Sequence, residues 1–439
     1  MKKVVKFGGS SLASAEQFRK VASIIRSDST RKYVVPSAPG KRFAGDAKVT
    51  DMLYKCYETA EADGDFTEQL GAIRERYQEI IDGLEITLSL EDEFASIEQH
   101  FRDKAGVQYA ASRGEYLNGI IMSRYLDFAF VDAAGGIVFD EDGTLDSDAT
   151  NRKLGELLNG LEYAVIPGFY GASADGTVHT FSRGGSDITG SLVARATRAD
   201  LYENWTDVSG CLVTDPRVVE NPMPIEIITY KELRELSYMG ASVLHEDAIF
   251  PVRTVGIPIN IRNTNRPQDK GTMIVRDTCS RSEYTITGIA GKKGFASITI
   301  EKGMMNSEIG FGRKVLQVFE DNGISFEHMP SGIDTMTILA HQTEFAEHEQ
   351  KVLTGIQKAV HPDSVSLEAD LALIAVVGRG MKSTRGTAGR IFAALAHAHV
   401  NVKMIDQGSS ELNIIIGVAN DDFETAIRAI YNIFVLCRI

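Results

Sequence analysis

The sequence has 439 residues, of which 43% are hydrophobic and 24% are charged, as is typical of globular proteins, and at about 150 residues per domain we expect about three domains. Its 46 basic and 60 acidic side chains give a formal net charge of −14, with no run of five or more basic residues. We therefore expect no nucleic-acid partner and no docking on anionic membranes, since both require a segregated basic surface.

The cysteine spacing and the hydropathy argue against metal-binding, disulfide-rich, membrane and secreted classes of protein. The cysteines form no CxxC pair, which argues against a zinc site and a disulfide scaffold. No apolar run approaches the roughly 18 residues of a membrane span, and the first strand meets glycines before a signal-peptide core could form. We expect a cytoplasmic protein with no protein-bound metal cluster and no membrane partner.

Short β-rich runs alternate with helical patterns up to about residue 265, which indicates a layered α/β domain with a mainly parallel sheet. Ser14 and Gln17 form a capping box before a helix whose Phe18, Val21 and Ile25 share one face. Residues 84–105 are acidic with helical period, and we expect a solvated outer layer there. The predicted strands are KVVKF (3–7), KYVVPS (32–37), FAFVDA (128–133), YAVIPGF (163–169), LYENWTD (201–207) and IPINIRN (257–263).

The C-terminal part contains an internal repeat after the linker-like RNTNRPQDKGT. GMMNSEIGFGRKVLQVFEDNGISFEHM, from Gly303, resembles GMKSTRGTAGRIFAALAHAHVNVKMI, from Gly380. Each copy reads as a strand, a glycine-bearing loop, an amphipathic helix and two strands, which predicts paired βαββαβ modules.

KFGGSS, residues 6–11, connects the first strand to the first helix. Gly8 and Gly9 would let backbone N–H groups approach an anion, and the helix N-terminus adds a favourable dipole. Lys6 would add a positive charge, although it precedes the glycines rather than following them as in a P-loop. Taken alone, the stretch is better explained by an ordinary tight connection, and the lysine changes that only slightly.

Two further segments give weaker signals. VVPSAPGKR (34–42) carries Ser37, Lys41 and Arg42 in a loop after a strand, where a proline-stiffened surface turn is the alternative. SRGEYLNG (112–119) places Glu115 in the expected first turn of a helix, where helix electrostatics is the simpler explanation.

SRGGSDITGSLVARA (182–196) is more specific. Gly184 and Gly185 free the backbone beside Arg183, whose planar guanidinium group suits bidentate binding of a carboxylate. Ser186 and Asp187 then open a helix. An N-cap would explain Ser186, but not an arginine beside the glycines.

NWTDVSGCLVTDPRVV (204–219) places Thr206, Asp207, Asp215 and Arg217 just beyond a strand. Ligands of open α/β sheets bind outside the carboxyl ends of strands, so these side chains are candidate nucleotide contacts. TDPR alone could be a turn.

LALIAVVGRGMKST (371–384) imitates a dinucleotide fingerprint. Ser383 stands where the third glycine is needed, and Asp406 lies further along than the about 20 residues expected. The segment also belongs to a repeat unit too small for a Rossmann domain, so we do not expect NAD binding.

In order, KFGGSS, VVPSAPG, SRGEYLNG, GFYGAS, SRGGSD, NWTDVSG, TDPR and GASVLHEDA resemble the aspartokinases of the amino acid kinase family, and the tandem repeat resembles their paired ACT domains. The resemblance covers essentially the whole chain. It implies an amino acid kinase domain at 1–270, with an open, mainly parallel sheet in αβα layers. It also implies two ferredoxin-like ACT domains, an effector-sensing one at 285–365 and a second at 366–439 that takes its first or last strand from 285–300.

The resemblance implies transfer of the ATP γ-phosphoryl group to the side-chain carboxylate of L-aspartate, with Mg²⁺ bridging the phosphates. The product, 4-phospho-L-aspartate, would begin lysine, threonine and methionine biosynthesis. Lys6 would stabilise the transferring group, and Asp187 would orient the lysine and the substrate. Implied substrate contacts are Ser37, Thr50, Glu115 (to the ammonium), Arg183 (to the α-carboxylate), Gly184, Gly185 and Ser186. Implied nucleotide contacts are Gly8, Gly9, Ser10, Thr206, Asp207, Asp215 and Arg217.

Two positions depart from the family pattern. Ser242, in GASVLHEDA, stands where many relatives carry a second lysine, and Leu212 replaces a common tyrosine. The loss of a cation would weaken transition-state stabilisation. We hypothesise that Lys41 or Arg42 compensates, and we expect His245 to be structural.

The paired repeats imply feedback regulation by an amino acid, with L-lysine favoured over L-threonine. Glu327 could pair with a ligand ammonium, and the alternative is an exposed strand carboxylate. Pairing of ACT edge strands between subunits implies a homodimer or a dimer of dimers. The implied effector contacts of the first copy are Met304, Ser307, Gly310, Phe311 and Glu327.

Two alternatives stay open. Another amino acid kinase, such as one acting on acetylglutamate, is disfavoured by SRGGSD and the tandem repeats. A catalytically silent ACT sensor is disfavoured by retention of Lys6, Glu115, Arg183 and Asp187. A fusion with homoserine dehydrogenase is not expected, because the sequence ends with the second repeat.

Overall fold

The computed structural model describes residues 1–182, 184–241, 244, 246–277 and 284–436. The chain divides into two compact units that interleave in sequence: Met1–Cys211, Pro224–Lys231 and Val243–Thr278 form the first, and Leu212–Met223, Glu232–Ser242 and Cys279–Ile439 form the second. The division at 1–270, 285–365 and 366–439 stays a prediction. Arg183, Ser242, His245, Cys279 and Cys437 lie outside the described residues.

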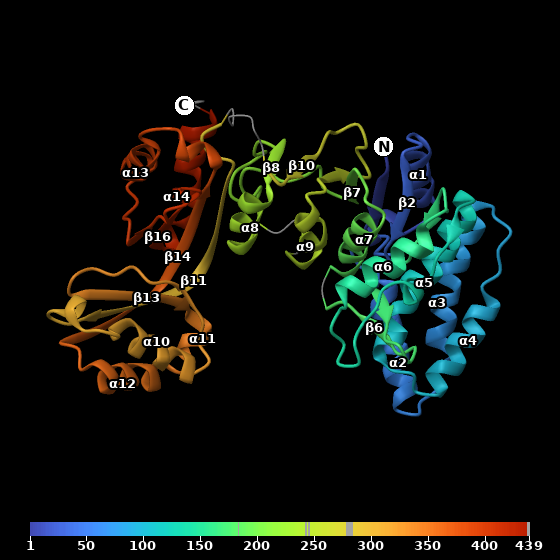
Figure 1. Cartoon of the computed structure of the whole chain (residues 1–439), viewed down its shortest axis with the longest axis horizontal. Coiled ribbons are helices and arrows are strands. Elements are labelled where there is room, and N and C mark those ends of the chain that lie inside the picture. Colours follow the sequence, from blue (N-terminus) through green and yellow to red (C-terminus); the bar gives the residue numbers. More distant parts are fainter. Residues whose placement is uncertain (183, 242–243, 245, 278–283, 437–439) are drawn as a thin grey trace. The chain divides into compact units, whose positions relative to one another are not determined.

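An eight-stranded sheet in the order β3-β4-β2-β1-β7-β9-β10-β8 forms the centre of the first unit (Figure 1). Neighbouring strands are parallel, apart from the antiparallel pair of β9 and β10. The six predicted strands are present, although 128–133 and 163–169 contribute only short ones. The bounds are β1 Lys3–Phe7, β2 Arg31–Pro36, β3 Ala129–Phe130, β4 Ala164–Val165, β7 Leu201–Thr206, β8 Ile227–Thr229, β9 Ile259–Asn263 and β10 Thr272–Val275, with a separate hairpin of β5 Tyr170–Ala172 and β6 Val178–Thr180.

Helices cover both faces of this sheet. One face packs with α1 (Ala15–Arg26), α2 (Val49–Glu61), α3 (Thr67–Leu84), α4 (Glu91–Arg102) and α5 (Val107–Leu126) in a core that includes Val5 and Phe7. α7 (Gly185–Ala196) packs on β1, β2 and β7, beside α6 (Ser147–Leu158) and α9 (Glu246–Val255). Because strand side chains alternate, Lys6 points away from the first core and toward α7.

Local signals place two of these helices. The Ser14 side chain accepts a hydrogen bond from the Gln17 backbone N–H at 3.4 Å, as the capping box predicts. α4 has an acidic first turn and buries Phe94, Ile97 and Phe101, so the predicted outer layer is a helix with one buried face. No helix within the described ranges is long and apolar enough to cross a bilayer.

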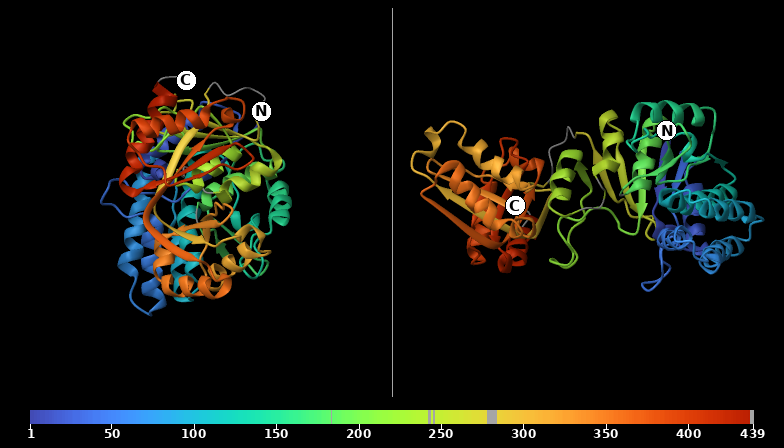
Figure 2. Two further views of the ribbon diagram at one scale, coloured as in Figure 1. Left: turned by 90° about the vertical axis from the view of Figure 1, so that its left-hand side faces the viewer. Right: turned by 90° about the horizontal axis from the view of Figure 1, so that it is seen from below.

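The second unit contains a six-stranded antiparallel sheet in the order β12-β13-β11-β14-β16-β15. The two long strands β11 and β14 pair with each other and serve both copies of the repeat, as Figure 2 shows in yellow and orange. The predicted paired βαββαβ architecture is thereby confirmed. The elements are α8 Tyr230–Tyr238 (mostly in this unit), β11 Gly288–Glu301, α10 Phe311–Asp321, β12 Phe326–His328, β13 Thr335–His341, α11 Gln342–Ala346, α12 Glu349–Val360, β14 Ser364–Val377, α13 Thr387–His397, β15 Met404–Asp406, β16 Asn413–Ala419 and α14 Phe423–Tyr431.

Candidate functional site

Lys6 and Asp187 form an ion pair at the centre of the first unit. Lys6 Nζ lies 2.6 Å from Asp187 Oδ1, and the two side chains are only 10% and 17% exposed. Asn204 Nδ2 donates to the same oxygen at 2.8 Å, and the Tyr202 hydroxyl donates to the Asp187 carbonyl at 3.2 Å. Such shielding strengthens the field of the ammonium group relative to water. The structure thus joins the two residues predicted to be catalytic.

The β1–α1 loop (8–14) follows Lys6 directly. The Gly8 N–H donates to the Trp205 carbonyl at 3.0 Å, and a Cβ on Gly8 would lie 3.6 Å from Lys6 Nζ. A Cβ on Gly9 would lie 2.8 Å from the Ala38 carbonyl oxygen, so the close approach of a second loop requires this glycine. Ser10 is exposed on a 3-10 turn.

The β2–α2 loop (37–48) lies against the first loop. The Ser37 N–H donates to the Phe7 carbonyl at 3.0 Å, and the Gly40 N–H donates to the Gly9 carbonyl at 2.8 Å. Asn118 Nδ2 on α5 donates to the Ser37 carbonyl at 2.6 Å. The carboxyl ends of β1 and β2 therefore carry two loops in direct backbone contact.

Glu115 is a buried carboxylic acid behind these loops. The residue is 6% exposed, and burial raises its pKa to about 8, against the lowering effect of the Ala38 and Glu115 backbone N–H groups and of the Lys6 charge. Oε2 of Glu115 has no hydrogen-bond partner among the described residues. Thr50 is near, because a Cβ on the adjacent Gly114 would lie 3.8 Å from Thr50 Oγ1. Glu115 is therefore a buried carboxyl group that keeps its proton at neutral pH and has one oxygen left unpaired by the described part of the chain.

The helix-dipole explanation of Glu115 is wrong. α5 begins at Val107, so Glu115 lies well inside the helix rather than in its first turn. Gly106, at φ +99°, starts the helix earlier than the SRGE motif suggested.

The SRGGSD motif leads into α7 as predicted, with one difference. The N-cap is Gly184, at φ +58°, rather than Ser186, which is 8% exposed and lies in the first turn. A Cβ on Gly168 would lie 2.5 Å from Ser186 Oγ, and a Cβ on Gly185 would lie 2.5 Å from the Phe169 ring, so close packing fixes this corner. Arg183 falls outside the described residues.

The predicted nucleotide contacts fall into two sets. Thr206 ends β7, and its hydroxyl donates to Asp207 Oδ1 at 3.2 Å in the first unit. Asp215 and Arg217 belong to the second unit and pair with each other at 2.6 Å, with the Arg217 side chain 88% exposed. This second pair therefore belongs to a different unit from Lys6.

Of the two residues predicted to compensate for Ser242, Lys41 and Arg42, the structure pairs Arg42 with carboxylates. Arg42 Nε lies 2.9 Å from Asp46 Oδ2, and Arg42 Nη1 lies 2.8 Å from Glu79 Oε2 on α3. Lys41 is exposed on the same loop. The proposed compensation for Ser242 therefore rests on Lys41, because two carboxylates neutralise Arg42.

The predicted effector residues differ in environment. Met304, Ser307 and Gly310 are exposed around the start of α10, whereas Phe311 is 3% exposed in the hydrophobic core of this half. Glu327 is 13% exposed, and His341 Nε2 lies 3.6 Å from its Oε1. Burial, then the hydrogen bond to Glu327, raises the pKa of Tyr238 to about 12. Glu327 is therefore not an exposed strand carboxylate.

The loop at residues 378–380, which imitates a dinucleotide fingerprint, binds a carboxylate of its own chain. Glu232, fully buried on α8, accepts hydrogen bonds from the Arg379 N–H at 2.9 Å and from the Thr287 hydroxyl at 2.6 Å. Arg379 Nη1 lies 2.9 Å from the other Glu232 oxygen. The positive groups of this loop hold α8 in place.

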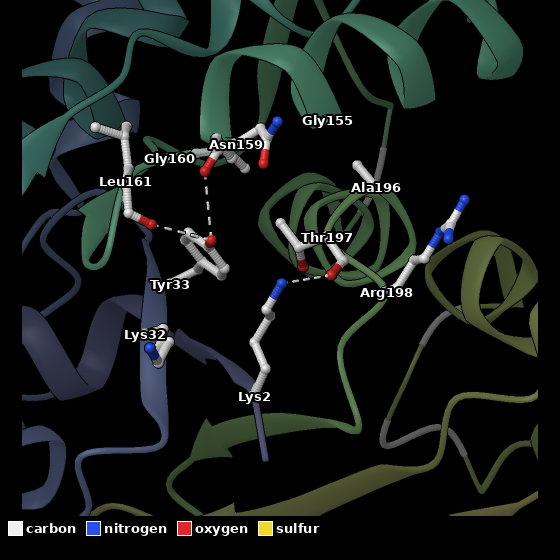
Figure 3. Close-up of a pocket in the computed structure, with 11 residues that line it drawn as sticks. Lys2, Lys32, Tyr33, Gly155, Asn159, Gly160, Leu161, Ala196, Thr197 and Arg198 are labelled. Atoms are coloured by element: carbon white, nitrogen blue, oxygen red, sulfur yellow. Dashed lines mark hydrogen bonds between the residues drawn. The ribbon is translucent and has the colours of Figure 1, made fainter.

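A cavity of about 600 Å³ lies at the amino ends of β1 and β2 (Figure 3). Lys2 Nζ donates to the Thr197 carbonyl at 2.9 Å, and the Tyr33 hydroxyl donates to the Leu161 carbonyl at 3.3 Å. These contacts satisfy carbonyls at and beyond the C-terminal ends of α7 and α6. None of the predicted site residues lines this cavity.

Sequence reasoning missed two residues of the site, Asn204 and Asn118. Asn204 is 3% exposed, and it orients Asp187 from the middle of β7. A polar residue within the otherwise buried LYENWT strand is a detectable signal, because a buried amide requires a partner. Asn118 lies within the SRGEYLNG motif, but its contact with Ser37 depends on long-range packing.

Comparisons with known proteins agree with this geometry. The amino acid kinase family matches residues 1–263, and an ACT domain matches residues 374–434. Aspartokinase 3 of Bacillus subtilis is 43% identical over 98% of this chain and 98% of its own.

Solved structures give the same result. Clostridium acetobutylicum aspartate kinase, described as an important allosteric enzyme, is 51% identical, with a TM-score of 0.91 over 99% of this chain and 100% of that one. Escherichia coli aspartokinase III, solved with lysine and aspartate in a T-state, is 25% identical, with a TM-score of 0.72 over 99% of each chain.

Glu115→Gln should remove a pH dependence of stability. The raised pKa means that folded Glu115 keeps a proton, which the unfolded chain releases, between its ordinary pKa of 4.5 and about 8. As the pH rises across that interval, Glu115 should therefore lower the free energy of unfolding by about 1.4 kcal/mol per pH unit. The neutral glutamine lacks this loss, so the variant should gain stability relative to wild type from pH 5 to pH 8.

Urea unfolding at three pH values measures the difference. Glu75→Gln, at an exposed position on α3, is the control. Its free energy of unfolding should differ from that of wild type by the same amount at each pH. If the difference in free energy of unfolding between Glu115→Gln and wild type is also independent of pH, the raised pKa of Glu115 is contradicted.

Proposed function

The chain belongs to the amino acid kinase family and is an aspartate kinase, and from this premise we propose how its residues transfer the γ-phosphoryl group of ATP to L-aspartate. The single observation that carries the assignment of roles is the shielded Lys6–Asp187 pair beside a glycine loop and the buried Glu115.

The chemistry explains why cations surround the site. A carboxylate oxygen of aspartate attacks the γ-phosphorus, a new O–P bond forms, the bond to the β-phosphate oxygen breaks, and ADP leaves. Both reactants are anions, so catalysis depends on positioning and on stabilising negative charge in the transition state. Lys6 supplies that charge at the end of β1. Asp187, which accepts a hydrogen bond from Asn204, holds the ammonium group in place.

Substrate binding uses the buried acid. Glu115 accepts the ammonium group of aspartate, which replaces the proton that burial favours in the free protein. Arg183 takes the α-carboxylate, as its motif predicts. The hydroxyls and backbone groups that complete this side of the site are Ser37, Thr50, Gly184, Gly185 and Ser186.

The nucleotide lies over the β1–α1 loop. Gly8, Gly9 and Ser10 approach its phosphates, and Thr206 and Asp207 contact it from the end of β7. Asp215 and Arg217 complete the nucleotide contacts in this proposal.

Mg²⁺ arrives with the phosphates of ATP and neutralises part of their charge. Across the residues with described positions, no group of three or more His, Cys, Asp or Glu side chains could hold a metal ion. Asp187 is already bound to Lys6 and Asn204.

The product, 4-phospho-L-aspartate, is the first intermediate of lysine, threonine and methionine biosynthesis in this proposal, and the enzyme works in the cytoplasm.

Feedback inhibition by L-lysine fits the paired ACT repeats. Glu327 offers a carboxylate on β12, although Tyr238 and His341 already contact it. Lysine must bind an inactive arrangement more tightly than an active one in order to inhibit. Subunits pair through ACT edge strands as a homodimer or a dimer of dimers.

A hydroxamate assay tests the reaction. With ATP, Mg²⁺ and hydroxylamine, the trapped acyl phosphate should give hydroxamate with L-aspartate and none above background with acetylglutamate. Preference for acetylglutamate would assign another amino acid kinase. The absence of ATP turnover with every substrate would favour a silent sensor.

Glu327→Gln tests the effector site. The variant should keep wild-type turnover without effector but require at least about tenfold more lysine for half inhibition, because a charge-assisted hydrogen bond is lost. Glu368→Gln, on β14 and paired with Lys403, is the matched control. If millimolar lysine leaves wild-type turnover unchanged and calorimetry shows no lysine binding, lysine is not the effector. Inhibition by threonine would then identify threonine as the effector.

A further inference from the structure

Arg76 is a buried arginine on α3, outside every motif that the sequence singles out. The residue is 4% exposed, which is unusual for arginine. Its Nη1 lies 2.8 Å from Asp46 Oδ2. Its Nη2 donates to two backbone carbonyls, that of Gly40 at 2.9 Å and that of Ala13 at 3.1 Å.

The two carbonyls belong to different loops. Ala13 caps the 3-10 turn of the β1–α1 loop, which carries Gly8, Gly9 and Ser10. Gly40 lies in the β2–α2 loop, shortly after Ser37. One guanidinium group therefore bonds to both loops that the proposed function assigns to phosphate and substrate.

The loops also contact each other directly. The Gly40 N–H donates to the Gly9 carbonyl at 2.8 Å, and a Cβ on Gly40 would lie 2.6 Å from the Gly9 carbonyl carbon. This contact fixes their separation on one side, and Arg76 fixes it from the α3 side. Glu79, one turn further along α3, adds a second tie by pairing with Arg42.

We propose that Arg76 is a positioning residue for phosphoryl transfer, which holds the β1–α1 loop and the β2–α2 loop at the spacing that the reaction needs. The inference rests on the proposed function, because it takes its importance from the roles of Gly8, Gly9, Ser10 and Ser37. Transfer between two anions depends on near-attack geometry, and a displacement of about 1 Å can cost about a hundredfold in rate.

The chemistry of the contact requires arginine. The planar guanidinium group presents several donors in fixed directions, so it can bond to Asp46 and to two carbonyls at once. Lysine could keep the charge opposite Asp46, but its compact ammonium group does not reproduce the fork. Glutamine removes the charge and most of the donors.

Kinetics of three variants tests the inference. Arg76→Gln and Arg76→Lys are compared with Arg74→Gln, which changes an arginine of the same helix whose partner is the outer Glu91. All assays run well below the melting temperature of each variant. We expect kcat of Arg76→Gln to fall about 10- to 100-fold with KM for aspartate changed by less than about threefold, because ground-state contacts of aspartate remain while transition-state alignment is lost.

Arg76→Lys should recover only part of this loss, with kcat about 3- to 10-fold below wild type, and Arg74→Gln should match wild type. If kcat per folded molecule of Arg76→Gln stays within about threefold of wild type, or if only KM rises, the positioning role is overturned. If Arg76→Gln does not fold, Arg76→Lys decides, because wild-type kcat in that variant would overturn the requirement for the fork. An inactive wild-type enzyme would instead refute the proposed function.

Discussion

The Lys6–Asp187 ion pair imposes conditions on much of the first unit. Two charges with little exposure are tolerated only when each has partners, because desolvation would otherwise outweigh their attraction. Asn204 supplies one partner from β7, and the packing of α7 against β1 brings Asp187 to the lysine. Side chains alternate along β1, so Val5 and Phe7 enter the core on one face of the sheet and Lys6 points to α7 on the other face. Gly8 follows Lys6 in the β1–α1 loop, and a Cβ there would lie 3.6 Å from the same ammonium group.

Several other ionisable groups outside this pair are also buried. Burial raises the pKa of Glu115 to about 8, so its carboxyl group keeps a proton at neutral pH. Arg76 ties two loops by their carbonyls from a helix that carries none of the sequence motifs. In the second unit, Glu232 and Arg379 hold α8 to the loop of the second repeat. The charges of Arg76, Glu232 and Arg379 are each paired, as physical chemistry requires of buried ionisable groups.

Sequence patterns predicted those features that depend on local periodicity. Strand alternation, the Ser14 capping box and the repeat copies from Gly303 and Gly380 all correspond to observed elements. Errors arose where a helix began earlier than its motif, as for Glu115 and Ser186. Arg76 looks like any arginine of an amphipathic helix, because its partners are distant in sequence. The environment of Glu327 likewise depends on Tyr238, from an element far away along the chain.

The most direct test of the central claim is the turnover of Lys6→Ala at saturating aspartate and ATP. If Lys6 stabilises the phosphoryl group in flight, kcat should fall by about a hundred- to a thousandfold, the usual effect of removing one preorganised charge-stabilising donor. Circular dichroism and lysine binding by calorimetry should stay unchanged, because Lys6 belongs to the first unit and the repeats to the second. Turnover of the folded variant close to that of wild type would contradict the account.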